Sequence, residues 1–331
     1  MNLITLRAAF LGIAAAAIVV ATVDARDFHS SDVLPADSPT VEAMKHMGEL
    51  LRQRTGGRLG INVEHSDKDS ENFTVGQVRT GLLDMARVNL AVFNSSLPTS
   101  IVPSLPYLFR STEHMRRVLD GPIGDRILAD MEAEGFIGLC FYDLGARSFY
   151  SSKGPIRRVE DFHGLNVRVQ PSDIWAELIR TLGAKPVPMP FDHVAAALKA
   201  GAIDASENNW LAYVATGHHH VAKYYSLTEH SMMPGVVVFS RKIWTELSPT
   251  DRRAVRVAAR ESVTFMRGKL DAYEVSARLK AENSGSLVID DVDRRSFAKM
   301  LLPLYPKLLP NPRLQQMVLD VQADVESGSV P

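Results

Sequence analysis

The feature that most constrains the fold of this 331-residue chain is one helical pattern that is too long for a single compact lobe. Ser248 and Pro249, with Asp251 three residues after the serine, form a helix start signal. Apolar side chains then recur at the 3.6-residue spacing of an amphipathic helix, at Val255, Ala259, Val263, Met266, Leu270 and Tyr273. No proline follows before Pro303, so we expect the helix to run to about Ala281.

Such a helix would be about 45 Å long at 1.5 Å per residue, whereas a small domain is roughly 30 Å across. We therefore predict that it spans two lobes as a shared spine. The alternative is a pair of helices with a break near Gly268. A chain of 331 residues is long enough to build two lobes with a sizeable core.

Helix and strand patterns alternate along the rest of the chain, which is typical of an α/β fold. One helix is expected from Pro39 to the glycines at 56–57, and others over 75–83, 112–119, 123–134, 174–182 and 194–200. Strands are expected over 59–63, 85–91, 136–142, 147–151, 165–170 and 236–240. A second region starts near Arg147, with no low-complexity linker before it.

The N-terminus has the pattern of a secretory signal peptide. Arg7 precedes an uncharged run from Ala8 to Val23, and polar residues follow at once. We predict cleavage after Ala25, which would place the mature protein outside the cytoplasm. The alternative is a membrane anchor, but the run is shorter than the roughly 20 apolar residues that a span needs. The formal net charge of −1 provides no basic field for a nucleic acid.

No familiar catalytic or metal-binding pattern is present in the sequence. It lacks G-x-S-x-G, H-E-x-x-H, a Walker loop and G-x-G-x-x-G. The single cysteine, Cys140, falls in an apolar run and is interpreted as a buried hydrophobic residue. The run of histidines at 218–220 could suggest a metal, but adjacent residues point in different directions. We interpret this run as a solvated helix end and predict no metal, no cofactor and no enzymatic activity.

Two arginines near the ends of predicted strands are the sharper signal. Arg147 follows a short loop, and Arg168 lies inside the apolar strand 165–169. An arginine in a buried strand needs an anionic partner, because burying an unpaired charge is costly. The planar guanidinium matches a carboxylate with two parallel hydrogen bonds. The partner could be a ligand carboxylate or an Asp or Glu of the protein, and the sequence leaves both possibilities open.

A polar segment, residues 204–210, provides further candidates. Asn208 can both donate and accept hydrogen bonds, which suits hydroxyl and carboxylate groups. Trp210 offers an apolar face to a sugar or a carbon chain. The alternative is a polar turn between two helices, with Trp210 in the core.

These pieces, in this order, resemble the DctP family, the extracytoplasmic solute receptors of tripartite ATP-independent periplasmic (TRAP) transporters. The resemblance covers essentially the whole mature chain. It is carried by Gly81-Leu82-Leu83-Asp84-Met85, Leu105-Pro106-Tyr107-Leu108-Phe109, Gly164-Leu165-Asn166-Val167-Arg168-Val169-Gln170, Met189-Pro190-Phe191 and Ile203-Asp204-Ala205-Ser206-Glu207-Asn208.

The resemblance implies a two-lobed periplasmic-binding-protein fold with a central cleft, crossing hinge strands and one long helix. It also implies that Arg168 forms the main salt bridge to a ligand carboxylate, assisted by Arg147 and Asn208. The lobes would close on the ligand, and the closed monomer would dock on the membrane permease subunits. We assign residues 1–25 to the signal peptide, 26–146 plus 237–272 to lobe I, and 147–236 plus 273–331 to lobe II.

A narrower resemblance points to members that bind sugar acids such as glucuronate and galacturonate. It rests on residues 207–210, 221–230 and 142–150. The ligand-binding set that we predict is Arg168, Arg147, Asn208, Asn209, Glu207, Gln170, Lys45, Glu71, Asn89 and Trp210. The sequence departs from those relatives at Val33-Leu34 and at residues 70–74, so the sugar is not fixed. An exported enzyme acting on acidic sugars and a receptor for a signalling partner are the alternative functions.

Overall fold

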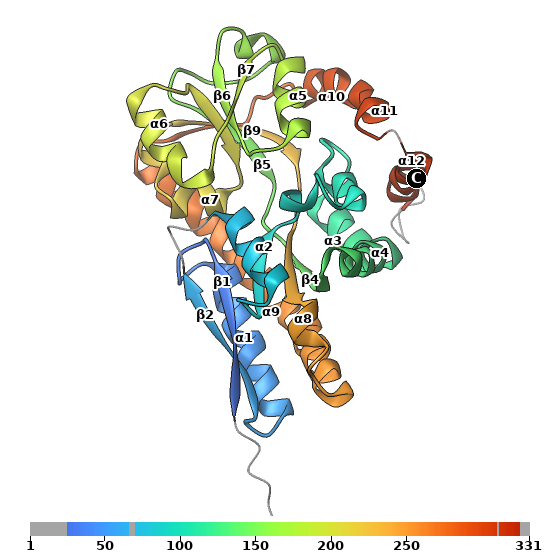
Figure 1. Cartoon of the computed structure of the whole chain (residues 1–331). Coiled ribbons are helices and arrows are strands. Elements are labelled where there is room, and N and C mark those ends of the chain that lie inside the picture. Colours follow the sequence, from blue (N-terminus) through green and yellow to red (C-terminus); the bar gives the residue numbers. More distant parts are fainter. Residues whose placement is uncertain (1–24, 66–69, 310, 325–331) are drawn as a thin grey trace, which may run out of the picture.

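The computed structural model describes residues 25–65, 70–309 and 311–324. The predicted signal peptide lies outside these residues, except for Ala25. Two sheets organise the chain (Figure 1). The five-stranded sheet has the order β2 (Leu59–His65), β1 (Arg26–Asp32), β3 (Met85–Asn89), β10 (Gly235–Ser240) and β4 (Phe136–Tyr142). The six-stranded sheet has the order β11 (Leu287–Ile289), β9 (Tyr224–Ser231), β5 (Arg147–Ser151), β8 (Ala205–Asn208), β6 (Asn166–Val169) and β7 (Lys185–Pro188).

The chain passes between the two sheets through two short crossover segments. Residues 143–146 join β4 of the first sheet to β5 of the second. Residues 232–234 bring the chain back from β9 to β10. The predicted α/β fold with two lobes and crossing strands is therefore confirmed. Below, the first lobe means the part of the chain built on the five-stranded sheet, and the second lobe the part built on the six-stranded sheet.

Helices cover both sheets. They are α1 (Pro39–Arg54), α2 (Glu71–Thr80), α3 (Thr112–Asp120), α4 (Pro122–Asp130), α5 (Asp173–Thr181), α6 (Val194–Ala200), α7 (Trp210–Ala215), α8 (Arg241–Trp244), α9 (Pro249–Asn283), α10 (Arg294–Leu301), α11 (Tyr305–Leu308) and α12 (Pro312–Ala323). In the described part of the chain, no helix is long and apolar enough to cross a bilayer.

Helix α9 is one continuous element of 35 residues, which confirms the predicted single helix and excludes the alternative of two helices with a break near Gly268. Its start is capped as expected, because the Ser248 hydroxyl accepts a hydrogen bond from the Asp251 N–H. The side chains of Val255, Ala258, Ala259, Val263, Met266 and Leu270 are buried in a core that α9 shares with α1 and the first sheet. Ala277 and Ala281 are buried in a core of the second lobe. The helix therefore spans both lobes, as predicted.

Local sequence explains where α2 begins and ends, although we expected this helix over 75–83. The Ser70 hydroxyl accepts a hydrogen bond from the Phe73 N–H at 3.3 Å, which starts the helix before the apolar stripe. Gly81, at a φ of 78°, ends it in the left-handed conformation that glycine adopts without strain. As a result, the first turn of α2 places Glu71 beside the end of β3.

The C-terminal segment packs on both lobes. Phe297 and Leu301 of α10 are buried in the core of the second lobe. The apolar residues of α12 are instead buried against the first sheet, at Leu314, Met317, Val318 and Val321. This differs from our assignment of all of residues 273–331 to lobe II. The remaining lobe boundaries stay a prediction.

Candidate ligand-binding site

A cavity of about 420 Å³ lies between side chains of the two lobes. This volume falls within the range of small-molecule sites, roughly 300–1,000 Å³. The first lobe contributes residues that follow β1, the start of α2 and the end of β3. The second lobe contributes residues of β5, β6 and β8, the loop before α6, and helix α7. Seven of the predicted ligand-binding residues line this cavity: Arg147, Arg168, Gln170, Glu71, Asn89, Asn208 and Asn209.

Arg168 lies on β6 with its side chain buried at the cavity. Its Nε and Nη2 atoms donate to the backbone carbonyl of Met189, at 3.0 and 2.8 Å. Burial lowers the pKa of its guanidinium, which nevertheless stays charged because arginine starts from so high a value. Among the described residues no Asp or Glu forms an ion pair with Arg168, so its charge has no protein acid beside it.

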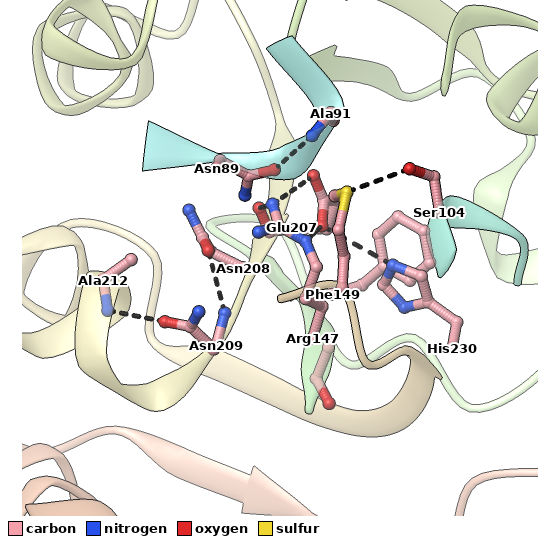
Figure 2. Close-up of polar contacts among 12 residues, drawn as sticks. Asn89, Ala91, Ser104, Arg147, Phe149, Glu207, Asn208, Asn209, Ala212 and His230 are labelled. Carbon is pink, nitrogen blue, oxygen red and sulfur yellow. Dashed lines mark hydrogen bonds and ion pairs between the residues drawn. The ribbon is translucent and has the colours of Figure 1, made fainter. Parts of the chain in front are cut away.

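Arg147 is different, because a protein carboxylate already neutralises it. Its Nε and Nη2 atoms bind the two oxygens of Glu207 at 2.6 and 2.8 Å (Figure 2). Both side chains are buried, and the guanidinium also lies 5.6 Å from the ring centre of Trp175. The alternative of an internal salt bridge therefore holds for Arg147 and not for Arg168.

Glu207 stands behind Arg147 rather than among the residues that line the cavity. The His230 Nε2 atom lies 3.6 Å from its carboxylate, and the Thr228 hydroxyl lies 2.9 Å from the other ring nitrogen of His230. Burial alone would raise the pKa of Glu207, but Arg147 and His230 outweigh it and lower that pKa to about 2. Glu207 is thus a permanent counter-charge for Arg147. We predicted that it contacts the ligand, but it lies behind Arg147 and is not among the residues that line the cavity.

Carboxamide groups line the cavity between the charged residues. The Asn209 oxygen caps α7 by accepting from the Ala212 N–H at 2.8 Å, and the Asn208 oxygen accepts from the Asn209 N–H (Figure 2). These contacts leave the NH₂ group of each amide as a donor. The Gln170 Nε2 atom is buried without a partner among the described residues. A ligand with several oxygens could satisfy these donors.

Arg87 is a cavity residue that the sequence analysis missed. It lies on β3 and is buried. Its Nε and Nη2 atoms bind the carboxylate of Asp32, and Nη1 lies 3.6 Å from the Glu71 carboxylate. The reasoning applied to Arg168 would have found it, because Arg87 also stands inside an apolar strand candidate.

Two residues of the predicted set lie away from the cavity. Lys45 is exposed on α1, and its ammonium group donates to the Ala36 carbonyl at 3.1 Å. The Trp210 ring stacks on Tyr225 with 3.9 Å between ring centres, where it packs against a core of the second lobe. Neither side chain is among those that line the cavity.

The histidine run is not a solvated helix end, so that interpretation is wrong. His218 and His219 are each 1% exposed, and His218 lines the cavity. Its Nδ1 atom lies 2.7 Å from the Tyr150 hydroxyl. Burial and the charge of Arg168 lower the pKa of His218 to about 3, so this ring is neutral at physiological pH.

Comparison with known proteins agrees with this geometry. Residues 30–310 match the bacterial extracellular solute-binding protein family 7, DctP. The chain belongs to this family. A solute-binding protein of Chromohalobacter salexigens is 31% identical over 317 residues, which cover 95% of this chain and 94% of that protein. DctP proteins are solute-binding components of transporters, so the predicted family and the absence of an enzymatic role are confirmed. Members of the family are periplasmic.

Solved structures of DctP proteins share the fold. A TRAP periplasmic solute-binding protein from Xanthobacter autotrophicus Py2, with bound β-D-galacturonate, is 45% identical, with a TM-score of 0.87. One from Roseobacter denitrificans, with bound β-D-glucuronate, is 35% identical, also with a TM-score of 0.87. Each comparison covers 90% of this chain and 99% of the other. This chain is therefore a solute-binding protein of the TRAP type, with the two-lobed fold of that class.

Proposed function

We propose that this DctP protein captures a hexuronate, either galacturonate or glucuronate, in the cavity between its lobes. The observation that carries the proposal is Arg168, a buried cation at the cavity with no acid of the described residues beside it. A ligand carboxylate would supply the missing charge and two parallel hydrogen bonds. The uronates bound by the relatives from Xanthobacter and Roseobacter support this class of ligand.

Sugar hydroxyls would complete the site. The amides of Asn208, Asn209 and Gln170 offer donors near Arg168, and Asn89 faces them from the first lobe. Val33 and Leu34 line the cavity as apolar surface, which suits the C–H face of a sugar ring. Closure of the lobes would exclude water and strengthen the pairing with Arg168. The closed state would be favoured only by the ligand's greater affinity for it.

The same proposal includes export and delivery. Cleavage after Ala25 would start the mature protein at Arg26, the first residue of β1. The protein would then work in the periplasm and hand its ligand to the membrane subunits of a TRAP transporter. Mass spectrometry of the exported protein would test the cleavage site, and a mature chain that begins elsewhere would contradict it.

Calorimetric titration with galacturonate and glucuronate tests the ligand and its anchor. Arg168→Ala should weaken uronate binding by at least about a hundredfold, because truncating one partner of a buried charge pair costs several kcal/mol. Arg168→Lys should recover only part of the affinity, since an ammonium lacks the planar fork.

Arg180→Ala is the matched control, because Arg180 is exposed on α5 of the same lobe. It should leave the dissociation constant unchanged. A nearly unaltered affinity in folded Arg168→Ala would show that Arg168 is not the anchor. If the unaltered protein bound neither uronate, the proposed ligand class would be wrong.

A further inference from the structure

The two walls of the cavity carry opposite net charge. On the second lobe there are two guanidinium groups, Arg147 and Arg168, and the single carboxylate of Glu207 pairs with Arg147 and not with Arg168. On the first lobe the balance is reversed, because one guanidinium, Arg87, faces two carboxylates. His218 is neutral. Asp192 also lines the cavity on the second lobe, but its side chain is 46% exposed, so that water screens its charge far more than the charges of the buried groups.

Glu71 is the carboxylate that makes the first wall negative. It is the first residue of α2, and its Oε1 atom accepts a hydrogen bond from the Asn89 N–H at 2.9 Å. The nearest cation is the Arg87 Nη1 atom at 3.6 Å. Two further nitrogens of Arg87 are already committed to Asp32, so Glu71 has at most a shared counter-charge.

Asp32 is not available to a ligand, because both oxygens of its carboxylate already accept hydrogen bonds from groups of the protein. It binds Arg87 through both oxygens, and it also accepts from the Thr40 hydroxyl and from the Leu34 N–H. Its side chain is fully buried, whereas the Glu71 side chain is 23% exposed and lines the cavity. The carboxylate that a ligand meets on the first lobe is therefore Glu71.

We propose that Glu71 makes the cavity selective for acids with one carboxylate, by accepting hydroxyl hydrogen bonds and repelling a second carboxylate. This inference rests on the proposed function, in which the ligand carboxylate binds Arg168. A hydroxy acid with one carboxylate complements the cavity. Its anionic end would meet Arg168, and its hydroxyl donors would meet Glu71. An aldarate, which bears a carboxylate at both ends, would bring like charges together at Glu71.

Several contacts bear on the charge of Glu71. Burial, with a smaller contribution from Asp32, raises the pKa of its carboxyl, and Arg87, the hydrogen bond from the Asn89 N–H and Arg147 oppose this rise without cancelling it. The N-terminus of α2 also favours the ionised form. An ionised carboxylate accepts hydrogen bonds and donates none, so it favours hydroxyls over a second acid group.

The test compares galacturonate with galactarate, the aldarate that has the same hydroxyl configuration, by calorimetric titration. The unaltered protein should bind galacturonate at least tenfold more tightly than galactarate. Glu71→Gln keeps the size of the side chain and one acceptor oxygen but removes the charge. This variant should bind galactarate at least tenfold more tightly than the unaltered protein does. The preference for galacturonate over galactarate should therefore become smaller or reverse.

Two further variants make the result specific. Glu71→Asp retains the charge, so it should keep the preference for galacturonate. Glu49→Gln, an exposed residue of α1 in the same lobe, should change neither affinity. Thermal melting of each variant verifies that it is folded.

The outcomes separate the two proposals. If the unaltered protein binds uronates but Glu71→Gln leaves the ratio of the two affinities unchanged, the role of Glu71 is wrong and the proposed function stands. An equal affinity of the unaltered protein for the two acids would also overturn the role of Glu71. If the unaltered protein binds neither acid, both proposals fail.

Discussion

At the scale of single residues, Arg147 and Glu207 form a buried ion pair in which each charge depends on the other. Both groups are buried, and Glu207 is the only carboxylate among the described residues that forms an ion pair with Arg147. Taking two charges out of water is compensated only while both partners remain. The pair therefore adds little net stability by itself, yet removing one of its two charges should lower the free energy of unfolding strongly.

We expect Glu207→Ala to lower the free energy of unfolding by about 3–5 kcal/mol, because it leaves a buried guanidinium without a counter-charge. Urea denaturation of the ligand-free protein measures this change. The double variant Arg147→Met with Glu207→Leu should recover part of the loss, since it removes both charges. A loss below about 1 kcal/mol, the usual value of an exposed ion pair, would contradict the expectation.

At the scale of elements, α9 meets the crossover segment 143–146 at Glu274. Gly145 has a φ of 79°, and a Cβ atom there would collide with the Glu274 carboxyl group. The left-handed φ favours glycine at this position, and any larger residue would also displace the Glu274 carboxyl group. Burial raises the pKa of Glu274 to about 7, with a further contribution from the charges of Asp271, Asp143 and Glu229 and an opposing one from Arg116.

The raised pKa of Glu274 predicts how stability depends on pH. Between its ordinary pKa of 4.5 and about 7, the folded protein holds a proton that the unfolded chain releases. This group therefore makes the protein less stable as pH rises through that window. Glu274→Gln should remove this loss, so that the variant is more stable than the unaltered protein by about 1–3 kcal/mol at pH 8 and similar to it at pH 4.

Urea denaturation of both proteins across this pH range measures the difference. Glu261→Gln, on an exposed part of the same helix, should show the pH dependence of the unaltered protein. A Glu274→Gln variant whose advantage did not grow between pH 4 and pH 8 would show that the carboxyl is ionised at little cost.

Elements were predictable from the sequence where apolar residues alone define them. Strand β4 has the predicted bounds, and β10 begins one residue earlier than expected, because both are buried apolar runs. Strands β1, β7, β8, β9 and β11 were missed, and β1 and β8 show one reason. The sequences of β1 and β8 are mainly polar, and these segments are strands because neighbouring strands pair with them on both sides.

The candidate site shows the same division between local and long-range information. Arg168 stood out because it interrupts an apolar strand, and the structure places it at the cavity. Whether a buried arginine has a protein partner depends on a contact distant in sequence, such as the one from Arg147 to Glu207. Sequence spacing could not supply that contact, and it could not bring Arg87 and Asp32 together.

At the scale of the whole molecule, two segments tie the lobes together besides the crossover segments. Helix α9 is buried in cores of both lobes. The C-terminal segment does the same, since α10 packs on the second lobe and α12 on the first. The two lobes are therefore joined on several sides, which should make unfolding of one lobe costly for the other.

Helix α12 offers a test of this coupling, because it lies far along the chain from the residues that line the cavity. The Met317 side chain is fully buried in the core of the first lobe, whereas Leu319, two residues later, is 56% exposed. Met317→Ala should lower the free energy of unfolding by about 2–5 kcal/mol through lost burial and the space left behind. Leu319→Ala, the matched control, should change it by less than about 0.5 kcal/mol.

Both α12 variants should bind galacturonate with unchanged affinity, because no residue of α12 lines the cavity. Urea denaturation followed by tryptophan fluorescence measures stability. It is done in two backgrounds, one that keeps only Trp175 and one that keeps only Trp244, with the other tryptophans replaced by Phe, so that each signal reports on one lobe. If the lobes are coupled as the packing indicates, Met317→Ala should shift both signals together. A shift confined to the first lobe would mean that the segments that connect the lobes do not make them unfold as one unit.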